Sequence, residues 1–184
     1  EKHCPGYDME ETNLFRAIDL MFCSPSPALT MEFQGGEPTL VPDLIRKAIE
    51  YAEERNREQK RHMTYVFVQT VSIDNDLLDI CKQYDVVIST SLDGPQFLHD
   101  RNRGKTDSYN RVIAGIEKAR AALGENHVSA LMTTSEYSLN FPTEIIDAYR
   151  NNGFHSIFIR ALNPYGLASS NADWTMYYKK FIAF

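Results

Sequence analysis

Two short segments of this 184-residue chain place glycine beside acidic or hydroxyl side chains, each directly after a predicted strand. The first is Gly35-Gly36-Glu37-Pro38. Paired glycines let the backbone approach a ligand closely and adopt φ values that other residues avoid. Exposed carbonyls and the Glu37 carboxylate could then accept hydrogen bonds from an ammonium group. Taken alone, however, the segment is explained more simply as a strand-to-helix turn.

The second segment is Ser91-Leu92-Asp93-Gly94-Pro95, which is followed by His99 and Arg103. Short hydroxyl and carboxylate side chains at the end of a strand suit the hydroxyl groups of a ribose. The simpler alternative is an Asp-Gly-Pro turn followed by a charged, solvated loop. A histidine in such a loop can act as a general acid or base, although it is more often only polar surface.

The elements that must position these segments alternate between the periodicities of helix and strand. Helices are predicted at 9–23, 42–61, 74–84, 109–123, 142–152 and from 173, and strands at 29–34, 64–70, 86–92, 128–133 and 155–160. This alternation predicts an α/β fold of parallel strands with helical crossovers, in which ligands bind beyond the carboxyl ends of the strands. No linker interrupts residues 1–184, so we expect a single domain. Periodicity alone does not separate a barrel from an open doubly wound sheet.

The faces of the predicted strands favour a barrel with a wet lumen. Thr30, Glu32 and Gln34 share one face of their strand, whereas an open sheet covered on both sides should be apolar on both. Unpaired buried charge is costly. We therefore expect an ion pair between Arg160 and one of the carboxylates of Glu32 and Asp93.

Composition excludes several classes of protein. The net charge of −6 argues against a general nucleic-acid binder and gives no basic patch for a membrane surface. No apolar run approaches the roughly 20 residues of a transmembrane helix, and no signal peptide opens the chain. The cysteines Cys4, Cys23 and Cys81 fit no metal motif, so no metal ligand is predicted. Cys23 and Cys81 are expected to be buried, and the odd count suits a reducing cytoplasm.

Taken together, the two segments resemble motifs of the radical S-adenosylmethionine (SAM) enzymes. Residues 31–40 resemble the GGEP motif of that superfamily. Ser91 to Pro95, with His99-Asp100 and Arg103 behind them, resemble the SLDGP…HD…R signature of its peptide-modifying members. That subgroup includes the anaerobic sulfatase-maturating enzymes and the His-Xaa-Ser system maturases. The resemblance covers nearly the whole chain.

The resemblance implies a partial (β/α)₆ barrel that binds SAM together with a [4Fe–4S] cluster held by three cysteines. It also implies a 5′-deoxyadenosyl radical that abstracts hydrogen from a peptide or protein substrate, and an electron donor similar to flavodoxin or ferredoxin. By the same resemblance the SAM amino group meets Gly35, Gly36 and Glu37, followed by Pro38; the ribose lies near Ser91 and Asp93; and the adenine borders Leu162. His99 and Arg103 are assigned to the substrate side or to the loop.

The chain also departs from this pattern. No Cys-x₃-Cys-x₂-Cys motif is present, so the first strand and the cluster loop are expected upstream of Glu1, and the piece itself is expected to be inactive. Val71 stands where the family commonly has Asn. One alternative is a regulatory module without a cluster that binds SAM or a peptide. Another is an unrelated β/α enzyme such as a sugar-phosphate aldolase. Such an enzyme would need a phosphate-binding loop or a lysine at a strand end, and neither is found.

Overall fold

The strands of the sheet occur in the order in which they occur in the sequence, β1-β2-β3-β4-β5. The computed structural model describes residues 9–35, 37–69, 73–164 and 173–184. The strands are β1 (Ala28–Phe33), β2 (His62–Gln69), β3 (Val87–Ser91), β4 (Val128–Thr134) and β5 (Phe158–Ala161). β1 pairs in parallel with β2, and β4 with β5. A doubly wound sheet reverses its strand order at a switch point, whereas a (β/α) barrel keeps sequence order. The prediction of a partial (β/α) barrel is thus confirmed.

Helices follow the strands as the alternation predicted. They are α1 (Glu11–Phe22), α2 (Pro42–Gln59), α3 (Asn75–Tyr84), α4 (Gln96–Arg103), α5 (Ser108–Leu123), α6 (Pro142–Asn151) and α7 (Trp174–Ala183), with short 3₁₀ turns η2 (Pro38–Leu40), η3 (Glu125–His127) and η4 (Ser138–Asn140). The last strand begins at Phe158 rather than at His155. No helix among the described residues is long and apolar enough to cross a membrane.

The expectation of a charged, solvated loop after Pro95 is wrong, because Gln96–Arg103 form helix α4. The helix buries only Leu98 and His99, so its hydrophobic periodicity is too weak to stand out in the sequence. Its ends nevertheless carry ordinary signals. Pro95 precedes the first turn, and Gly104 ends the helix at φ 61°, a left-handed conformation that favours glycine.

The chain divides into two compact units, Glu1–Ser89 with Lys118–Val128 (unit 1) and Thr90–Glu117 with Ser129–Phe184 (unit 2). The single domain expected from the sequence therefore stays a prediction.

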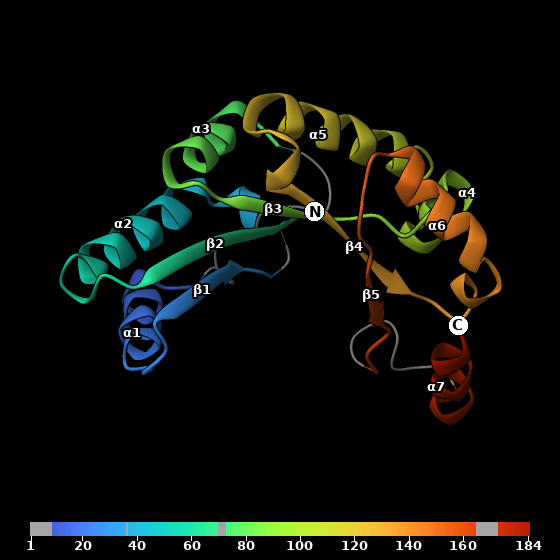
Figure 1. The fold of residues 1–184 in the computed structure, drawn as a ribbon, viewed down its shortest axis with the longest axis horizontal. Coiled ribbons are helices and arrows are strands. Elements are labelled where there is room, and N and C mark those ends of the chain that lie inside the picture. The colour runs from blue at the N-terminus through green and yellow to red at the C-terminus, as the bar shows by residue number, and fades with distance from the viewer. Residues whose placement is uncertain (1–8, 36, 70–72, 165–172) are drawn as a thin grey trace. The chain divides into compact units, whose positions relative to one another are not determined.

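In unit 1, α1 packs against α2 and α2 against α3, so that the three helices form a layer along the strands (Figure 1). The Phe15 ring stacks on Tyr51 with centroids 4.3 Å apart. Leu29 and Met31 of β1 are buried whereas Thr30 and Glu32 are exposed. The predicted alternation of an apolar and a polar face is confirmed on this strand.

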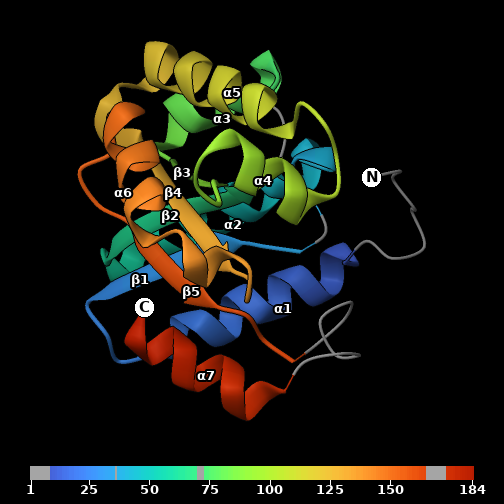
Figure 2. The same ribbon diagram turned by 90° about the vertical axis from the view of Figure 1, so that its right-hand side faces the viewer.

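In unit 2, α6 lies along β4 and α7 lies beside the carboxyl end of β5 (Figures 1 and 2). Met132 and Thr134 of β4 are fully buried, and Thr133 between them points to the other face. The register pairs Thr133 with Arg160. Arg160 is exposed, so this second face of β4 and β5 is an open one.

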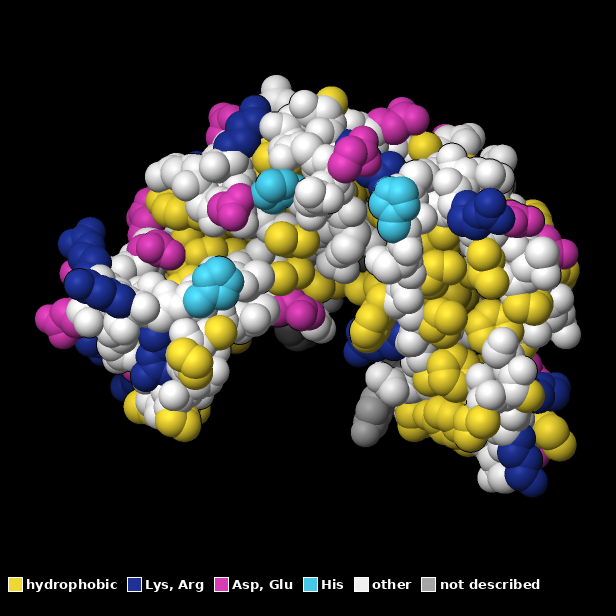
Figure 3. All heavy atoms as spheres, viewed as in Figure 1, with side chains coloured by type: hydrophobic (Ala, Val, Ile, Leu, Met, Phe, Trp, Pro, Cys, Tyr) yellow, Lys and Arg dark blue, Asp and Glu magenta, His cyan; other side chains and the backbone are white. Residues whose placement is uncertain are grey.

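Exposed apolar side chains of unit 2 gather over β5 and α7 (Figure 3). Phe158 and Ile159 of β5 and Met176 and Ile182 of α7 belong to them. Apolar surface exposed in this way is typical of places where further protein packs. It contrasts with the outer turns of α2 in unit 1, where acidic and basic side chains are interspersed (Figure 3).

Candidate functional site

The first candidate segment follows β1 in unit 1, and its backbone is open to approach. Gly35 has φ 148°, a conformation that L side chains rarely adopt, so glycine is required there. A Cβ atom added at Gly35 would meet no atom within 4 Å. Nothing in the described part of the chain therefore covers this side of the Gly35 backbone. Gly36 lies outside the described residues.

Glu37 and Pro38 connect this open backbone to the η2 turn. Glu37 is half-buried in an extended conformation, and Pro38 is the first residue of the turn. The Thr39 hydroxyl donates a hydrogen bond of 2.8 Å to Oε1 of Glu37. This bond orients the carboxylate directly after the glycine backbone. The segment can therefore offer carbonyl oxygens and one oriented carboxylate to a cationic group.

The second candidate segment, at the end of β3, lies in unit 2 and is buried. The Leu92 N–H donates to the Leu131 carbonyl of β4 at 2.9 Å. The Tyr149 hydroxyl of α6 donates to the Leu92 carbonyl at 2.6 Å. Burial raises the pKa of Tyr149, so the hydroxyl remains a proton donor. The backbone between Ser91 and Asp93 is thus held from two elements.

Gly94 fixes the next position of this segment. It has φ 120°, and a Cβ atom added there would lie 2.9 Å from Cγ1 of Ile145 and 3.1 Å from Cδ2 of Leu98. Glycine is therefore required both for the conformation and for the space between α4 and α6.

Asp93 is paired with Arg103, the last residue of α4. The Asp93 side chain is only 1% exposed. Nη2 of Arg103 donates to Oδ1 of Asp93 at 2.8 Å, and Nε lies 2.8 Å from Oδ2 at an angle outside the hydrogen-bond range. The backbone N–H of Thr133 also donates to Oδ1 at 3.1 Å. Both carboxylate oxygens thus face Arg103, as in two-point arginine–carboxylate pairs.

This arrangement corrects the expectation that Asp93 could pair with Arg160. Helix α4 carries Arg103 back over the end of β3, and its guanidinium takes the position that the hypothesis gave to Arg160. Arg103 could not be placed beside Asp93 from the sequence, because helix α4, which brings it there, was not predicted.

His99 is buried inside α4 rather than exposed in a loop. It is 1% exposed. Nδ1 lies 3.2 Å from the backbone nitrogen of Asp93, and Nε2 lies 3.2 Å from the Ser108 hydroxyl. A backbone N–H only donates, so Nδ1 is the acceptor and Nε2 carries the proton. Burial lowers the pKa of His99, which favours this neutral form. With both nitrogens engaged, His99 is placed to hold structure rather than to exchange protons with a ligand.

The Ser91 hydroxyl is different from its neighbours. The residue is 6% exposed, and its side chain makes no hydrogen bond within the described part of the chain. A hydroxyl of this kind, at the carboxyl end of a parallel strand, is available to a ligand.

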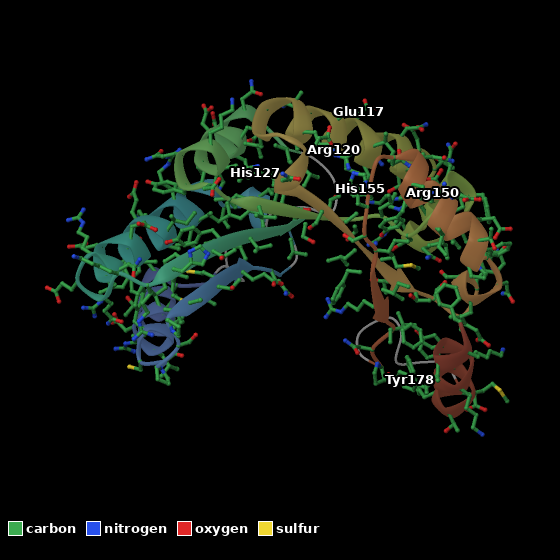
Figure 4. The ribbon with its side chains drawn as sticks, viewed as in Figure 1. Glu117, Arg120, His127, Arg150, His155 and Tyr178 are labelled. Carbon is green, nitrogen blue, oxygen red and sulfur yellow. The ribbon has the colours of Figure 1, made fainter. Side chains whose placement is uncertain are left out.

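The backbone of Leu162, after β5, is held by two tyrosines of α7. The Leu162 N–H donates to the Tyr177 hydroxyl at 2.7 Å, and that hydroxyl donates to the Thr134 carbonyl at 2.5 Å. The Tyr178 hydroxyl donates to the Leu162 carbonyl at 3.2 Å, and Figure 4 shows Tyr178 projecting from α7 towards this segment. Sequence reasoning missed both tyrosines, although the predicted helix after 173 contained them.

The described residues do not fit an iron–sulfur cluster. They contain no group of three or more His, Cys, Asp or Glu side chains that could hold a metal ion. Cys81 is buried in α3, and burial raises the pKa of its thiol to about 12, which disfavours the thiolate that binds metals. Cys23 is exposed, which corrects the expectation that it is buried, because it caps α1 just after the helix ends. Cys4 and Val71 lie outside the described residues.

Comparison with known families gives one match over most of the chain. The family model described as the radical SAM superfamily matches residues 2–138. A cysteine-type anaerobic sulfatase-maturating enzyme of Clostridium novyi is 28% identical over 117 residues, which are 61% of this chain and 31% of that protein. An uncharacterised protein of Methanothermobacter thermautotrophicus is 29% identical over 152 residues, which are 80% of this chain and 55% of that protein. The chain thus spans from about a third to about half of these relatives.

Solved structures are similar in fold. "Native anSMEcpe with bound AdoMet and Kp18Cys peptide" matches with a TM-score of 0.74 and 18% identity, covering 95% of this chain and 50% of that one. "Native anSMEcpe with bound AdoMet and Cp18Cys peptide" matches with a TM-score of 0.77 and 17% identity over the same shares. At this identity the likeness concerns the fold.

Proposed function

This chain belongs to the radical SAM superfamily, and on that premise we propose that it is the SAM-binding part of an enzyme that modifies a peptide or protein. The observation that carries the proposal is the segment after β1. There an approachable Gly35 backbone is followed directly by a Glu37 carboxylate that Thr39 orients. Carbonyl and carboxylate acceptors at the carboxyl end of a parallel strand suit the ammonium group of SAM.

We assign the ammonium group of SAM to Gly35, Gly36 and Glu37, with Pro38 fixing the turn behind them. Pairing an ammonium with a carboxylate gives a charge-assisted hydrogen bond, which is shorter and stronger than a neutral one. The η2 turn helps because it holds Glu37 in place before a ligand arrives, so that little ordering entropy is lost on binding.

We assign the ribose and adenine to unit 2. The Ser91 hydroxyl has no partner of its own there and can bond a ribose hydroxyl. Asp93 lies two residues further on, but its carboxylate faces Arg103, so we give it the task of shaping the segment around the ribose. Tyr177 and Tyr178 hold the backbone of Leu162 in place, so that this backbone can border the planar adenine at a fixed position.

The SAM bound in such a protein would supply the 5′-deoxyadenosyl group that abstracts hydrogen from the substrate once an electron has been delivered. A [4Fe–4S] cluster belongs to this chemistry in the family, but the described residues offer no ligand set for it. A flavodoxin- or ferredoxin-like protein is the electron donor that we propose.

A peptide or protein substrate is proposed from two comparisons. The C. novyi relative is named a sulfatase-maturating enzyme, and two similar structures hold a peptide. The open face of β4 and β5, with Arg160 on it, is the surface of unit 2 that we expect such a substrate to meet.

SAM binding by the full-length protein tests the proposal. Isothermal titration under anaerobic conditions compares the wild type with Glu37→Gln, which keeps the shape of the side chain and removes its charge. We expect the dissociation constant to rise about tenfold, because a charge-assisted hydrogen bond contributes about 1.5–3 kcal/mol.

Glu58→Gln is the matched control for this experiment. Glu58 is exposed on α2 of the same unit, and its substitution changes the net charge by the same amount. Equal dissociation constants for all three proteins would remove Glu37 from the site. A wild type that does not bind SAM would overturn the proposed function.

A further inference from the structure

We infer that His99 is a positioning residue of the SAM site, which holds the β3–α4 turn through the backbone N–H of Asp93 and so fixes the Ser91 hydroxyl for the ribose. The inference rests on the proposed function for its ligand. The contacts that support it all lie inside unit 2 and are independent of that ligand.

The Asp93 backbone N–H needs an acceptor because the residue is buried. β3 ends at Ser91, so no regular ladder of the sheet continues to Asp93. A buried N–H without a partner is unfavourable, because it loses the hydrogen bond that water gives it in the unfolded chain. Nδ1 of His99 lies 3.2 Å from this nitrogen and supplies the acceptor. The side chain of Asp93 is held separately, by Arg103.

His99 also ties the turn to the start of α5. Its Nε2 lies 3.2 Å from the hydroxyl of Ser108, and its ring meets the Tyr109 ring edge-on with centroids 6.1 Å apart. The next residue, Asp100, accepts from the backbone N–H of Tyr109 at 2.8 Å. The adjacent residues His99 and Asp100 of α4 thus connect the β3–α4 turn to the start of α5, so that a movement of one would displace the other.

The environment of His99 determines its protonation and therefore its hydrogen bond with the Asp93 N–H. Asp93 faces it from the turn, Asp100 and Arg103 from its own helix, and Tyr109 from α5. Burial is the largest influence and disfavours the imidazolium; Arg103 acts in the same sense, and Asp93 and Asp100 act against it.

Protonation would remove the acceptor. An imidazolium carries N–H groups on both nitrogens, so Nδ1–H would face the Asp93 N–H, donor against donor. The turn is therefore held while His99 is neutral and is released in acid. A residue that only filled space would show no such dependence on pH.

Two substitutions of His99 separate these effects. His99→Asn keeps an acceptor oxygen near the position of Nδ1 but does not titrate. His99→Phe keeps a ring of similar size but has no acceptor. The full-length protein, reconstituted anaerobically, is titrated with SAM at about pH 8 and about pH 5, the range over which histidines change charge. Hydrogen exchange of the segment 91–95, corrected for intrinsic rates, is measured alongside.

For the wild type we expect SAM to bind about tenfold more weakly at the lower pH, the effect of one lost buried hydrogen bond. His99→Phe should bind weakly at both pH values and exchange faster at 91–95. His99→Asn should bind at both pH values about as the wild type does at the higher one. The inference is overturned if His99→Phe binds and exchanges like the wild type at the higher pH, or if His99→Asn keeps the wild-type dependence on pH.

Failure of this inference and failure of the proposed function give different results. If no protein binds SAM, the proposed function is wrong, and hydrogen exchange still decides whether His99 holds the turn. If His99→Phe does not fold, the pH profiles of the wild type and of His99→Asn carry the comparison.

Discussion

The two candidate segments follow strands in the same way but are built differently. After β1, no atom lies within 4 Å of the position that a Cβ of Gly35 would take, and the neighbouring Thr39 hydroxyl donates to the Glu37 carboxylate. After β3, Asp93 and His99 are each 1% exposed; Asp93 is bonded to α4 and β4, and His99 to Asp93 and to α5. The proposed ligand would therefore meet an approachable backbone in the first segment, whereas the second segment is held by its own hydrogen bonds before a ligand arrives.

This difference predicts that substitutions in the two segments affect different properties. Changes after β1 should alter ligand binding and leave the fold intact. Changes at Asp93, Gly94 and His99 should first cost stability, and should affect the ligand only through the shape of the turn.

The largest effect is expected at Asp93. Asp93→Asn removes the charge that faces Arg103, and breaking a buried ion pair from one side costs about 3 kcal/mol. Urea unfolding measures the change in the free energy of unfolding. Asp85→Asn is the control, because the Asp85 side chain is 90% exposed beside His127, and it should stay within about 0.5 kcal/mol of the wild type. Similar losses for both would show that the Asp93 pair is no stronger than a surface one.

The two glycines sharpen the same contrast. Gly94→Ala combines backbone strain with an approach of 2.9 Å to Ile145, so we expect a loss of about 2–3 kcal/mol in stability. Gly35→Ala meets no atom and should cost only about 1 kcal/mol of strain, yet it places a methyl group where SAM is proposed to approach. Thermal unfolding together with SAM titration distinguishes them, and an equal loss of stability would contradict the difference drawn between the segments.

Acid should weaken unit 2 through His99. Its pKa is lowered from 6.5 in the folded state, so below about pH 6.5 the unfolded chain binds a proton that the folded chain does not. Stability from this group is complete above that pH and falls as the pH drops, by at most about 1.4 kcal/mol per unit. Urea unfolding at several pH values should give a shallower profile for His99→Asn than for the wild type. Identical profiles would mean that His99 titrates normally.

The smallest effect on stability is expected at Glu37. Glu37→Gln should change the free energy of unfolding by less than about 0.5 kcal/mol, since the side chain is half-buried and its amide can still accept from Thr39. A larger loss in urea unfolding would show that Glu37 serves the fold as Asp93 does.

The sequence predicts the frame of this molecule better than it predicts its buried polar contacts. Strands and helices follow from periodicity, and both glycine segments are found at strand ends as expected. Helix α4 was missed because only two of its residues are buried. The burial of His99 and the pairing of Arg103 with Asp93 could therefore not be predicted either, because both depend on where α4 lies over the sheet. The roles of Tyr177 and Tyr178 are hidden for the same reason, because hydrogen bonds between distant segments leave no local pattern.

The roles proposed for Glu37 and Ser91 both require that the protein bind SAM and cleave it. The most direct measurement is 5′-deoxyadenosine formed by the full-length protein with SAM and a reductant under anaerobic conditions, quantified for the wild type, Glu37→Gln and Glu58→Gln. We expect 5′-deoxyadenosine from the wild type and from Glu58→Gln, and several-fold less from Glu37→Gln at limiting SAM. A wild type that leaves SAM intact after the cluster has been reconstituted would contradict this expectation.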